Sequence, residues 1–353
     1  MEKIKVIVVD DSAFMRKMIS DMVNEENDME VITTARNGQD LIEKLKSYQP
    51  DVITLDVEMP IMDGLETLKN IKKLQLKVKV LMISSSTDSA SKITIDCLKE
   101  GAVDFVTKPS GAISLDIDKI KDDLTTKIRI IYNNCTNCSN CNEQKQVKAM
   151  NYSAKRDISI RHRCEAVVIA ASTGGPRAVH TVIEALPKNI NVPVLVVQHM
   201  PKGFTKTFAE RLDQSSNLKV VEASDMQDIE RNVVYIAPGG FHMEVKNDKK
   251  IHLNQDPILL GVRPAADKLF ISASNVYKSE LLSVVLTGMG KDGTDGTIHI
   301  KNNGGYTIAQ DKDTSVIYGM PKSAYETGKI DEVIPLYNIS SRITELIKES
   351  RYL

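Results

Sequence analysis

The sequence has no long apolar run, either at its beginning or in its interior. Residues Met1–Lys5 lead directly into a short apolar segment, and no later segment approaches the length of a membrane-spanning helix. The sequence therefore predicts neither a signal peptide nor a transmembrane helix. We expect a cytoplasmic protein that does not insert into a membrane.

An excess of charge of either sign is also absent. The 46 Lys and Arg residues balance 47 Asp and Glu residues, which gives a formal net charge of -1. Binding to nucleic acid or to an acidic membrane surface normally requires a basic excess. We therefore expect neither kind of partner, and the second half of the chain shows no helix-turn-helix pattern that would indicate a DNA-binding output.

Cysteine is scarce, with five residues in the chain. Cys97 and Cys164 are isolated and are expected to be reduced thiols in a cytosolic protein. Cys135, Cys138 and Cys141 form a C-x-x-C-x-x-C pattern. Cys164 could add a fourth thiolate and complete a zinc site. We favour the alternative that the three clustered cysteines belong to a polar tether.

The chain does contain a repeated alternation of short β-branched runs and amphipathic helical segments. Its 353 residues suffice for two domains. We expect the first at residues 1–125, a polar linker at 126–163 and the second at 164–353. The alternation predicts an α/β fold, with parallel sheets covered by helices.

Particular segments carry this prediction. The expected strands are Lys5–Val9, Glu30–Ala35, Val52–Leu55, Lys79–Ile83, Asp104–Thr107, Ala166–Ala170, Val192–Gln198, Val233–Ile236, Leu281–Leu286 and Tyr306–Ala309. The expected helices include Ala13–Asn24, Gln39–Tyr48, one that begins near Pro176, and a last one at about Ser340–Lys348.

Three aspartates of the first domain, Asp10, Asp11 and Asp56, lie at the ends of expected strands. The carboxyl ends of parallel strands meet at one edge of a sheet, so these carboxylates should converge and require a cation. A few hard oxygen ligands suit Mg²⁺. A metal-bound aspartate can attack a phosphoryl donor, and Ser84 and Lys108 follow later strands and could contact the new phosphoryl group. Each aspartate alone would suit a helix cap or a turn.

Together with Glu58–Gly64 and Lys108-Pro109, these aspartates resemble the receiver domain of two-component response regulators, over roughly residues 3–125. The resemblance implies a flavodoxin-like fold with a five-stranded parallel sheet, and Asp56 as the phosphoacceptor. It implies Mg²⁺ held by Asp11, Asp56 and the main-chain carbonyl of Glu58, with Asp10 in support. It also implies a group of residues that carry the signal, namely Ser84, Phe105 and Lys108.

In the second domain, Ser172 follows the apolar run Ala166–Ala171 and precedes Thr173-Gly174-Gly175-Pro176. Proline is favoured in the first helical turn and serine at the cap. We therefore expect Ser172 at a strand-to-helix junction, near the positive end of a helix, which is a suitable place for a nucleophile. A simple helix-capping serine would have the same local sequence.

Two further residues could activate this serine. His199 follows the apolar strand Val194–Val197 and could accept the serine proton. Asp292 follows Leu281–Leu286 and could orient the imidazole, while the main-chain N–H of Met289 could complete an oxyanion hole. The glycines nearby lack the spacing of a dinucleotide fingerprint, of a phosphate loop and of the G-x-S-x-G elbow.

Four segments resemble the chemotaxis protein-glutamate methylesterase (CheB) family: Ala171–Pro176, Gln198–Pro201, Ala237–Gly239 with His242, and Leu286–Gly293. The resemblance covers about residues 165–348. It implies a doubly wound, mostly parallel α/β methylesterase domain that needs no cofactor. It implies a catalytic triad of Ser172, His199 and Asp292. It also implies that Thr173 and Met289 lie near the oxyanion.

The two resemblances together predict a phosphorylation-activated serine esterase of chemotaxis adaptation. Its substrates would be methylated glutamates on the cytoplasmic part of chemoreceptors, with deamidation of certain glutamines, and its phosphodonor a chemotaxis histidine kinase. The resting receiver would pack over the active site. Two alternatives stay open at this point: a regulated hydrolase of a small ester or amide, and a non-enzymatic phospho-switch that acts as an adaptor.

Overall fold

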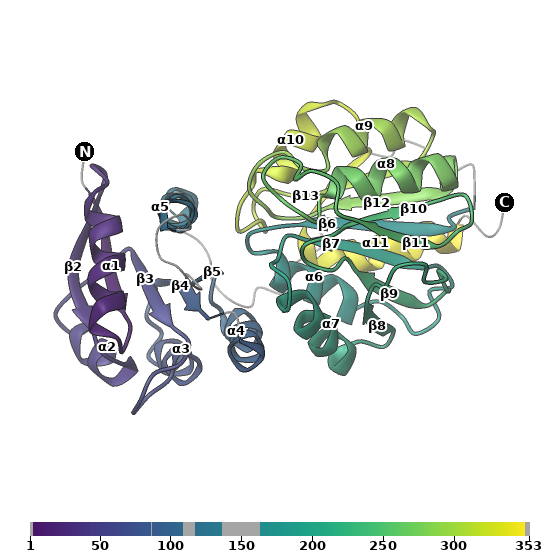
Figure 1. The fold of residues 1–353 in the computed structure, drawn as a ribbon. Helices are drawn as coiled ribbons and strands as arrows, with labels where there is room; N and C mark the ends of the chain where they lie inside the picture. Colours follow the sequence, from purple (N-terminus) through teal and green to yellow (C-terminus); the bar gives the residue numbers. More distant parts are fainter. Residues whose placement is uncertain (1–2, 86, 109–116, 136–162, 350–353) are drawn as a thin grey trace.

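The computed structural model describes residues 3–85, 87–108, 117–135 and 163–349, and these form two α/β domains (Figure 1). In each domain, helices cover both faces of a parallel sheet. This confirms the predicted fold class. The first domain is purple to blue in Figure 1, and the second is teal to yellow.

The sheet of the first domain has the strand order β2-β1-β3-β4-β5, and all its strands are parallel. The strands are β1 (Ile4–Val9), β2 (Met29–Ala35), β3 (Val52–Asp56), β4 (Lys79–Ser84) and β5 (Asp104–Thr107). The helices are α1 (Ala13–Asn24), α2 (Gly38–Lys44), α3 (Gly64–Lys73), α4 (Asp88–Glu100) and α5 (Ile117–Cys135). The expected domain boundary at residue 125 therefore falls inside α5.

Strand β1 shows why helices cover both faces. Side chains alternate between the faces of a strand. Val6 and Val8 pack in one cluster with residues of α1 and α5, whereas Ile7 and Val9 pack in another with residues of α2, α3 and α4. All four of these side chains are fully buried. The two-sided burial explains the nearly unbroken apolar runs in the sequence.

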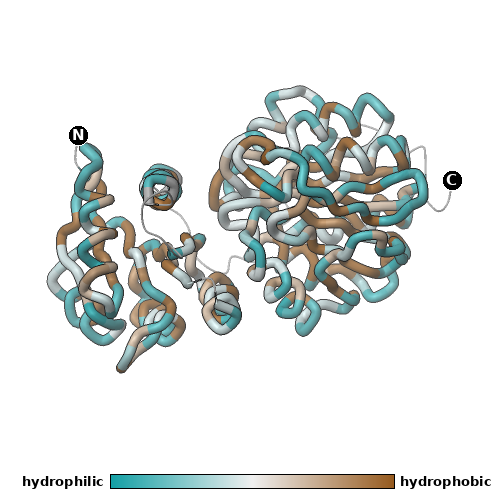
Figure 2. Tube along the Cα trace, in the orientation of Figure 1, coloured by the Kyte–Doolittle hydropathy of each residue, from teal (hydrophilic) through white to brown (hydrophobic). Residues whose placement is uncertain are grey.

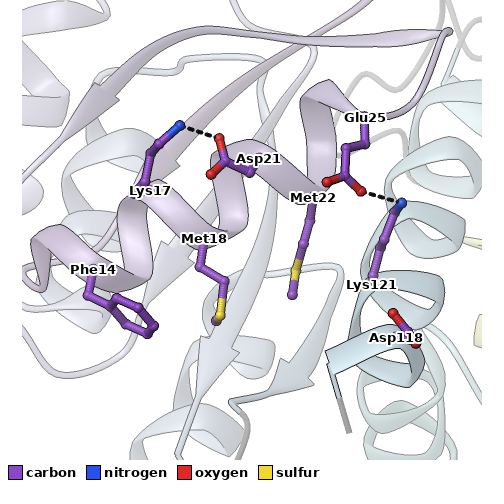
Figure 3. Close-up of a pocket in the computed structure, with 8 residues that line it drawn as sticks. All are labelled: Phe14, Lys17, Met18, Asp21, Met22, Glu25, Asp118 and Lys121. Atoms are coloured by element: carbon purple, nitrogen blue, oxygen red, sulfur yellow. Dashed lines mark hydrogen bonds and ion pairs between the residues drawn. The ribbon is translucent and has the colours of Figure 1, made fainter. Parts of the chain in front are cut away.

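Helices α1 and α5 form a groove of about 370 Å³ (Figure 3). Phe14, Met18 and Met22 of α1 contribute apolar side chains. Lys121 of α5 forms an ion pair with Glu25 at the end of α1, at 2.7 Å. This ion pair joins the two helices across the groove.

The second domain has a sheet of the order β14-β13-β12-β6-β7-β9-β8, whose paired strands are all parallel, and a separate antiparallel hairpin of β10 and β11. The strands are β6 (Ala166–Ala171), β7 (Val194–Gln198), β8 (Lys219–Glu222), β9 (Val233–Ile236), β10 (His242–Val245), β11 (Ile251–Asn254), β12 (Leu281–Val285), β13 (Tyr306–Gln310) and β14 (Glu332–Ile334). The helices are α6 (Gly175–Glu184), α7 (Phe204–Ser215), α8 (Ala266–Tyr277), α9 (Thr294–Asn302), α10 (Met320–Glu326) and α11 (Leu336–Glu349), with a 3₁₀ turn at Lys278–Glu280.

The central strand β6 again divides the core into two. Val167 and Ile169 pack in one cluster with residues of α6, α7 and α11, while Val168 and Ala170 pack in the other with residues of α8, α9 and α10. Figure 2 shows the resulting apolar interior, with the hydrophilic segments outside. Among the described residues, no helix is long and apolar enough to cross a membrane.

The domains meet where α4 of the first packs against α6 and α7 of the second (Figure 1). The rings of Phe105, on β5, and Phe204, on α7, stack with centroids 4.5 Å apart and an interplanar angle of 23°. Beside them, Arg211 of α7 forms an ion pair with Asp96 of α4 at 2.7 Å. The two domains therefore share a contact that combines an apolar centre with a partly exposed ion pair.

Candidate active site

Sheet register places Ser172 and His199 beside each other. Strands β6 and β7 are parallel neighbours in which Ala171 pairs with Gln198, so the next residue of each strand is Ser172 or His199. The His199 N–H donates to the Ala171 carbonyl at 3.1 Å, which extends the pairing past the strand ends. Both residues follow the carboxyl ends of their strands, where open parallel sheets bind ligands.

The loop after β12 approaches the serine from the other side. The Ser172 N–H donates to the Thr287 carbonyl at 3.0 Å. A Cβ atom on Gly288 would lie 2.7 Å from the Ser172 Cβ, so only glycine permits this approach. The order of the strands reverses its direction between β12 and β6. In open parallel sheets, ligands usually bind in the crevice at such a topological switch point.

The same loop carries Asp292, which bonds to His199. The His199 Nε2 and the Asp292 Oδ2 are 2.7 Å apart, and the carboxylate is only 3% exposed. Backbone N–H groups of three residues also donate to this carboxylate, at 2.6–3.0 Å: those of Ala266, Asp267 and Gly293. Burial by itself would raise the pKa of Asp292. This effect is outweighed by the hydrogen bond and charge of His199 and by the backbone donors, so the pKa of Asp292 is lowered.

Because the His199 Nε2 points at Asp292, the other ring nitrogen, Nδ1, would be the atom that accepts a proton from Ser172. Ser172, His199 and Asp292 all line one cavity of about 380 Å³, together with Thr173 and Met289. Thr173 is buried, whereas Met289 is 44% exposed on the rim. The structure thus brings all five residues expected from the sequence to one place.

One detail of the expected serine site differs. The N-cap of α6 is Gly174, in the left-handed region with φ +74°, and not Ser172. No side chain caps this helix. The Ser172 hydroxyl is therefore not used as a helix cap, which leaves it available for chemistry.

Sequence reasoning missed Gln198, the residue before His199. Its side chain is buried, and Nε2 donates to the Ser172 carbonyl at 3.0 Å and to the His199 carbonyl at 3.1 Å. One amide thus connects the backbones of both residues. The only sequence signal was its place in the Gln198–Pro201 segment.

A second chemical site lies at the strand ends of the first domain. Asp10 and Asp56 are buried and Asp11 is exposed, and each can offer a carboxylate oxygen within 4.8 Å of the other two. This close set of hard oxygen donors fits a divalent cation, because three carboxylates without one would repel each other. Glu58, two residues after Asp56, has an exposed side chain.

Lys108 connects two of these acids. Its Nζ lies 2.8 Å from the Asp10 Oδ2 and 2.7 Å from the Asp56 Oδ2. Burial would lower the pKa of Lys108, but the bonds to both carboxylates outweigh it and raise this pKa. Burial and the charge of Asp10 raise the pKa of Asp56 to about 6, although Lys108 opposes the rise.

Two other expected switch residues connect this site to the rest of the chain. Ser84 is fully buried at the end of β4 and accepts a hydrogen bond from the Thr94 hydroxyl of α4 at 2.7 Å. Phe105 stacks on Phe204, as described above. The clustered cysteines Cys138 and Cys141 lie outside the described residues, and Cys135 ends α5, so the question of a zinc site stays open.

Comparison with known proteins finds a matching family for each domain. The family model for the CheB methylesterase matches residues 167–343, and that for the response regulator receiver domain matches residues 6–117. A protein-glutamate methylesterase/protein-glutamine glutaminase of Clostridium acetobutylicum is 51% identical over 353 residues, which cover 99% of this chain and 100% of the relative. The chain belongs to the CheB methylesterase family.

A sequence and a crystal structure from Thermotoga maritima extend the comparison of this family member. A protein-glutamate methylesterase/protein-glutamine glutaminase is 44% identical over 347 residues and covers 98% of both chains. The crystal structure of the CheB methylesterase catalytic domain from the same organism superposes with a TM-score of 0.51 and 48% identity, covering 52% of this chain and 98% of that one. The likeness of this CheB-family chain to its relatives therefore spans both domains.

In this CheB-family chain the serine site faces the receiver. The cavity lined by Ser172 and His199 is closed on its other side by residues of β5 and α5: Asp104, Phe105, Thr107, Asp123 and Lys127. Lys127 connects α5 to β5 in this wall, because its Nζ donates to the Phe105 carbonyl at 2.6 Å and lies 3.5 Å from the Asp104 carboxylate. The receiver thus forms part of the boundary of the candidate active site.

Proposed function

We propose that this protein is a phosphorylation-activated protein-glutamate methylesterase that also deamidates glutamines, acting on the cytoplasmic domains of chemoreceptors. The observation that carries the proposal is the His199–Asp292 bond beside Ser172, in a cavity whose opposite wall is the receiver. Relatives with this name match nearly the whole chain. The proposed substrate and phosphodonor support a cytoplasmic location.

The esterase chemistry follows from the arrangement of the triad. His199 Nδ1 accepts the Ser172 proton as the serine oxygen bonds to the γ-carbonyl carbon of a methylglutamate. The tetrahedral intermediate collapses, the ester C–O bond breaks, and methanol leaves with the proton from His199. Water then attacks the acyl-enzyme with His199 as base, which frees glutamate and Ser172. With glutamine as substrate, ammonia leaves in place of methanol.

Asp292 and the backbone near the serine stabilise the charges that develop. The ionised Asp292 fixes the His199 tautomer and favours the imidazolium that forms in the transition state. The N–H groups of Thr173 and Met289 are the proposed donors to the oxyanion, since both residues line the cavity beside Ser172.

In the receiver, Asp56 is the proposed phosphoacceptor and a chemotaxis histidine kinase the proposed donor. Mg²⁺, when bound, would neutralise charge on the incoming phosphoryl oxygens. Asp11, Asp56 and the main-chain carbonyl of Glu58 would hold it, with Asp10 in support. Lys108 would then pair with the new phosphoryl group, giving up its present bond to the Asp56 carboxylate.

Regulation would act through the contact between the domains. Phe105 is buried against Phe204 and adjoins the cavity, so a receiver that shifts on phosphorylation changes access to Ser172. Such a switch is a population shift, and an activation of ~100-fold needs a coupling of only about 2.7 kcal/mol.

The deciding experiment measures methanol release from methylated chemoreceptor membranes, with and without Mg²⁺ and a small acyl phosphate as phosphodonor. We expect release that rises with the donor, no release by Ser172→Ala, and no rise in Asp56→Asn. Ser341→Ala, at an exposed position on α11, is the matched control and should behave like the wild type.

Every other result of this experiment would favour a different function. Release that is indifferent to the donor would retain the esterase and reject the switch. Hydrolysis of small esters without release from receptors would identify a different hydrolase. Folded protein that is inactive on every ester would identify a phospho-switch adaptor.

A further inference from the structure

Helix α8 begins without a capping side chain of its own. Its N-cap is Ala265, which offers no side-chain acceptor. The first N–H groups of α8 are instead satisfied by the triad acid, because Ala266 donates to the Asp292 Oδ2 at 2.6 Å and Asp267 to its Oδ1 at 3.0 Å. Asp292, from the loop before α9, thus caps α8.

Helix α9 shows the converse arrangement. Its N-cap is Gly293, again without a side-chain cap. The Gly296 N–H in its first turn donates to the Asp267 Oδ1 at 2.7 Å. Asp267, from the first turn of α8, thus caps α9. Each helix start is therefore capped by a carboxylate from the other segment, and one of these two carboxylates belongs to the triad acid, Asp292.

Close packing fixes the exchange. A Cβ atom on Gly296 would lie 2.4 Å from the Phe270 Cβ and 3.2 Å from the Asp267 Oδ1, so the two helix starts are in contact through this glycine. Asp267 is only 3% exposed. A shift of either helix start would therefore move Asp292, and with it the bond to His199.

We propose that Asp267 is a positioning residue for the triad acid: it holds the start of α9, and so Asp292, against the start of α8, and its charge lies behind the Asp292–His199 pair. This inference rests on the proposed serine-esterase chemistry. Asp267 touches no reacting atom in that scheme and acts through Asp292.

The electrostatics around Asp267 give the inference a pH signature. Burial, together with the charges of Asp292 and Asp295, raises the pKa of Asp267 to about 7, although the N–H groups of Gly296 and Gly293 oppose the rise. His199 faces it across Asp292. Asp267 therefore becomes negative as the pH rises through neutrality, and its charge then further stabilises the imidazolium of the transition state.

The test compares Asp267→Asn and Asp267→Ala in the full chain. Asn keeps an oxygen for the Gly296 N–H but loses the charge, and Ala loses both. We expect kcat for methanol release to fall about tenfold in the Asn variant with KM unchanged, equivalent to about 1.4 kcal/mol of transition-state stabilisation, and further in the Ala variant. The rise of kcat/KM across neutral pH should flatten, and the NMR signal of the His199 Nε2–H proton, which reports the bond to Asp292, should shift relative to wild type.

Asp331→Asn is the matched control. Asp331 is a buried carboxylate of the same domain, accepts from the Thr307 N–H at 3.0 Å and lies outside the serine site. This variant should lose stability and keep the wild-type pH profile. Folded Asp267→Asn with wild-type kcat, or with a lower kcat but an unchanged pH profile and an unchanged His199 Nε2–H signal, would overturn the inference.

The experiment remains decisive even if a variant does not fold or the wild type is inactive. Should Asp267→Ala fail to fold, which circular dichroism would reveal, Asp267→Asn alone decides between the outcomes above. Should the wild type release no methanol, the proposed function fails, and the NMR signal of the His199 Nε2–H proton in wild type and Asp267→Asn still supports or rejects the positioning role.

Discussion

At the scale of single residues, His242 shows how a buried side chain supports the site from a distance. It is fully buried, its Nδ1 accepts from the Ala265 N–H at 3.2 Å, and its Nε2 donates to the Pro257 carbonyl at 3.2 Å. Ala265 directly precedes the start of α8, which holds Asp292. His242 therefore fixes the segment that bonds to Asp292.

This histidine should make stability depend on pH. Burial lowers the pKa of His242, assisted by the charges of Lys268 and Arg263, so the folded state holds the ring neutral. An unfolded histidine titrates near pH ~6.5. Above that pH the stabilisation is complete, and below it the unfolded state binds more protons, so stability falls as the pH falls.

We predict that His242→Gln, which retains one acceptor and one donor but cannot titrate here, has a shallower loss of unfolding free energy between about pH 7.5 and 5.5 than the wild type. Urea unfolding across this range measures it. Ser272→Ala, which removes the hydroxyl that accepts from the Val245 N–H at 3.1 Å but no titratable group, is the control and should retain the wild-type slope. An unchanged slope in His242→Gln would refute the assignment.

At the scale of elements, the junction between β6 and α6 determines where Ser172 lies. Gly174 adopts φ +74°, and a Cβ there would lie 2.6 Å from the Val316 Cβ. A Cβ on Gly175 would lie 2.0 Å from the Gln198 Oε1. The two glycines allow the chain to turn from strand to helix within a short segment and to pass close to two neighbouring segments.

Gly174→Ala should therefore reduce both stability and activity. The left-handed backbone disfavours any Cβ by about 1–2 kcal/mol, and contact with Val316 forces the junction to move. We expect kcat to fall by about tenfold or more, since small displacements of a nucleophile have large effects.

Gly328→Ala is the matched control for this variant. Gly328 also has a positive φ, +68°, but nothing lies within 4 Å of its Cβ position. It should lose stability alone, as measured by thermal unfolding, and keep its kcat. Equal kcat values in the two variants would show that the contact with Val316 does not position Ser172.

At the scale of the whole molecule, the receiver and the esterase domain share one contact and one cavity. The apolar cluster of the receiver that contains Phe105 continues into the cluster of the second domain that contains Phe204. Because the candidate serine lies in the cavity beside this contact, the strength of the contact should set the activity of the unphosphorylated protein.

Arg211→Ala should raise the basal activity modestly. The side chains of Arg211 and Asp96 are 35% and 33% exposed, so their ion pair contributes about 0.2–1 kcal/mol and its loss should raise activity no more than about fivefold. Methanol release without phosphodonor measures the change. Arg231→Ala removes an ion pair to Glu165 within the second domain and is the control.

A charge exchange tests the same contact independently. Arg211→Asp should raise basal release more than Arg211→Ala, and the double variant with Asp96→Arg should return it towards the wild-type level. Basal release that is indifferent to all three variants would mean that this ion pair does not restrain the receiver.

Much of the candidate site could be read from the sequence, because its residues follow strands. Asp10, Asp56, Ser172 and His199 each come directly after or at the end of a β-branched run, and parallel sheets bring such ends together. The helix at Gln39–Tyr48 is shorter than its apolar pattern predicted and ends at Lys44. Strands β8 and β14 and the hairpin of β10 and β11 were missed, because these short segments mix charged or polar residues with apolar ones and form no clear apolar run.

The sequence by itself determined the two α/β domains, the family and the residue types at both sites, because hydrophobic alternation and strand-end positions are local properties of the chain. Only the tertiary structure decided that Asp267 meets the start of α9, that Gln198 bonds to both backbones, and that Phe105 stacks on Phe204. Each of these contacts joins segments whose meeting depends on how helices pack on sheets and domains on each other. That packing is set by the shapes of many side chains together, and no local pattern records it.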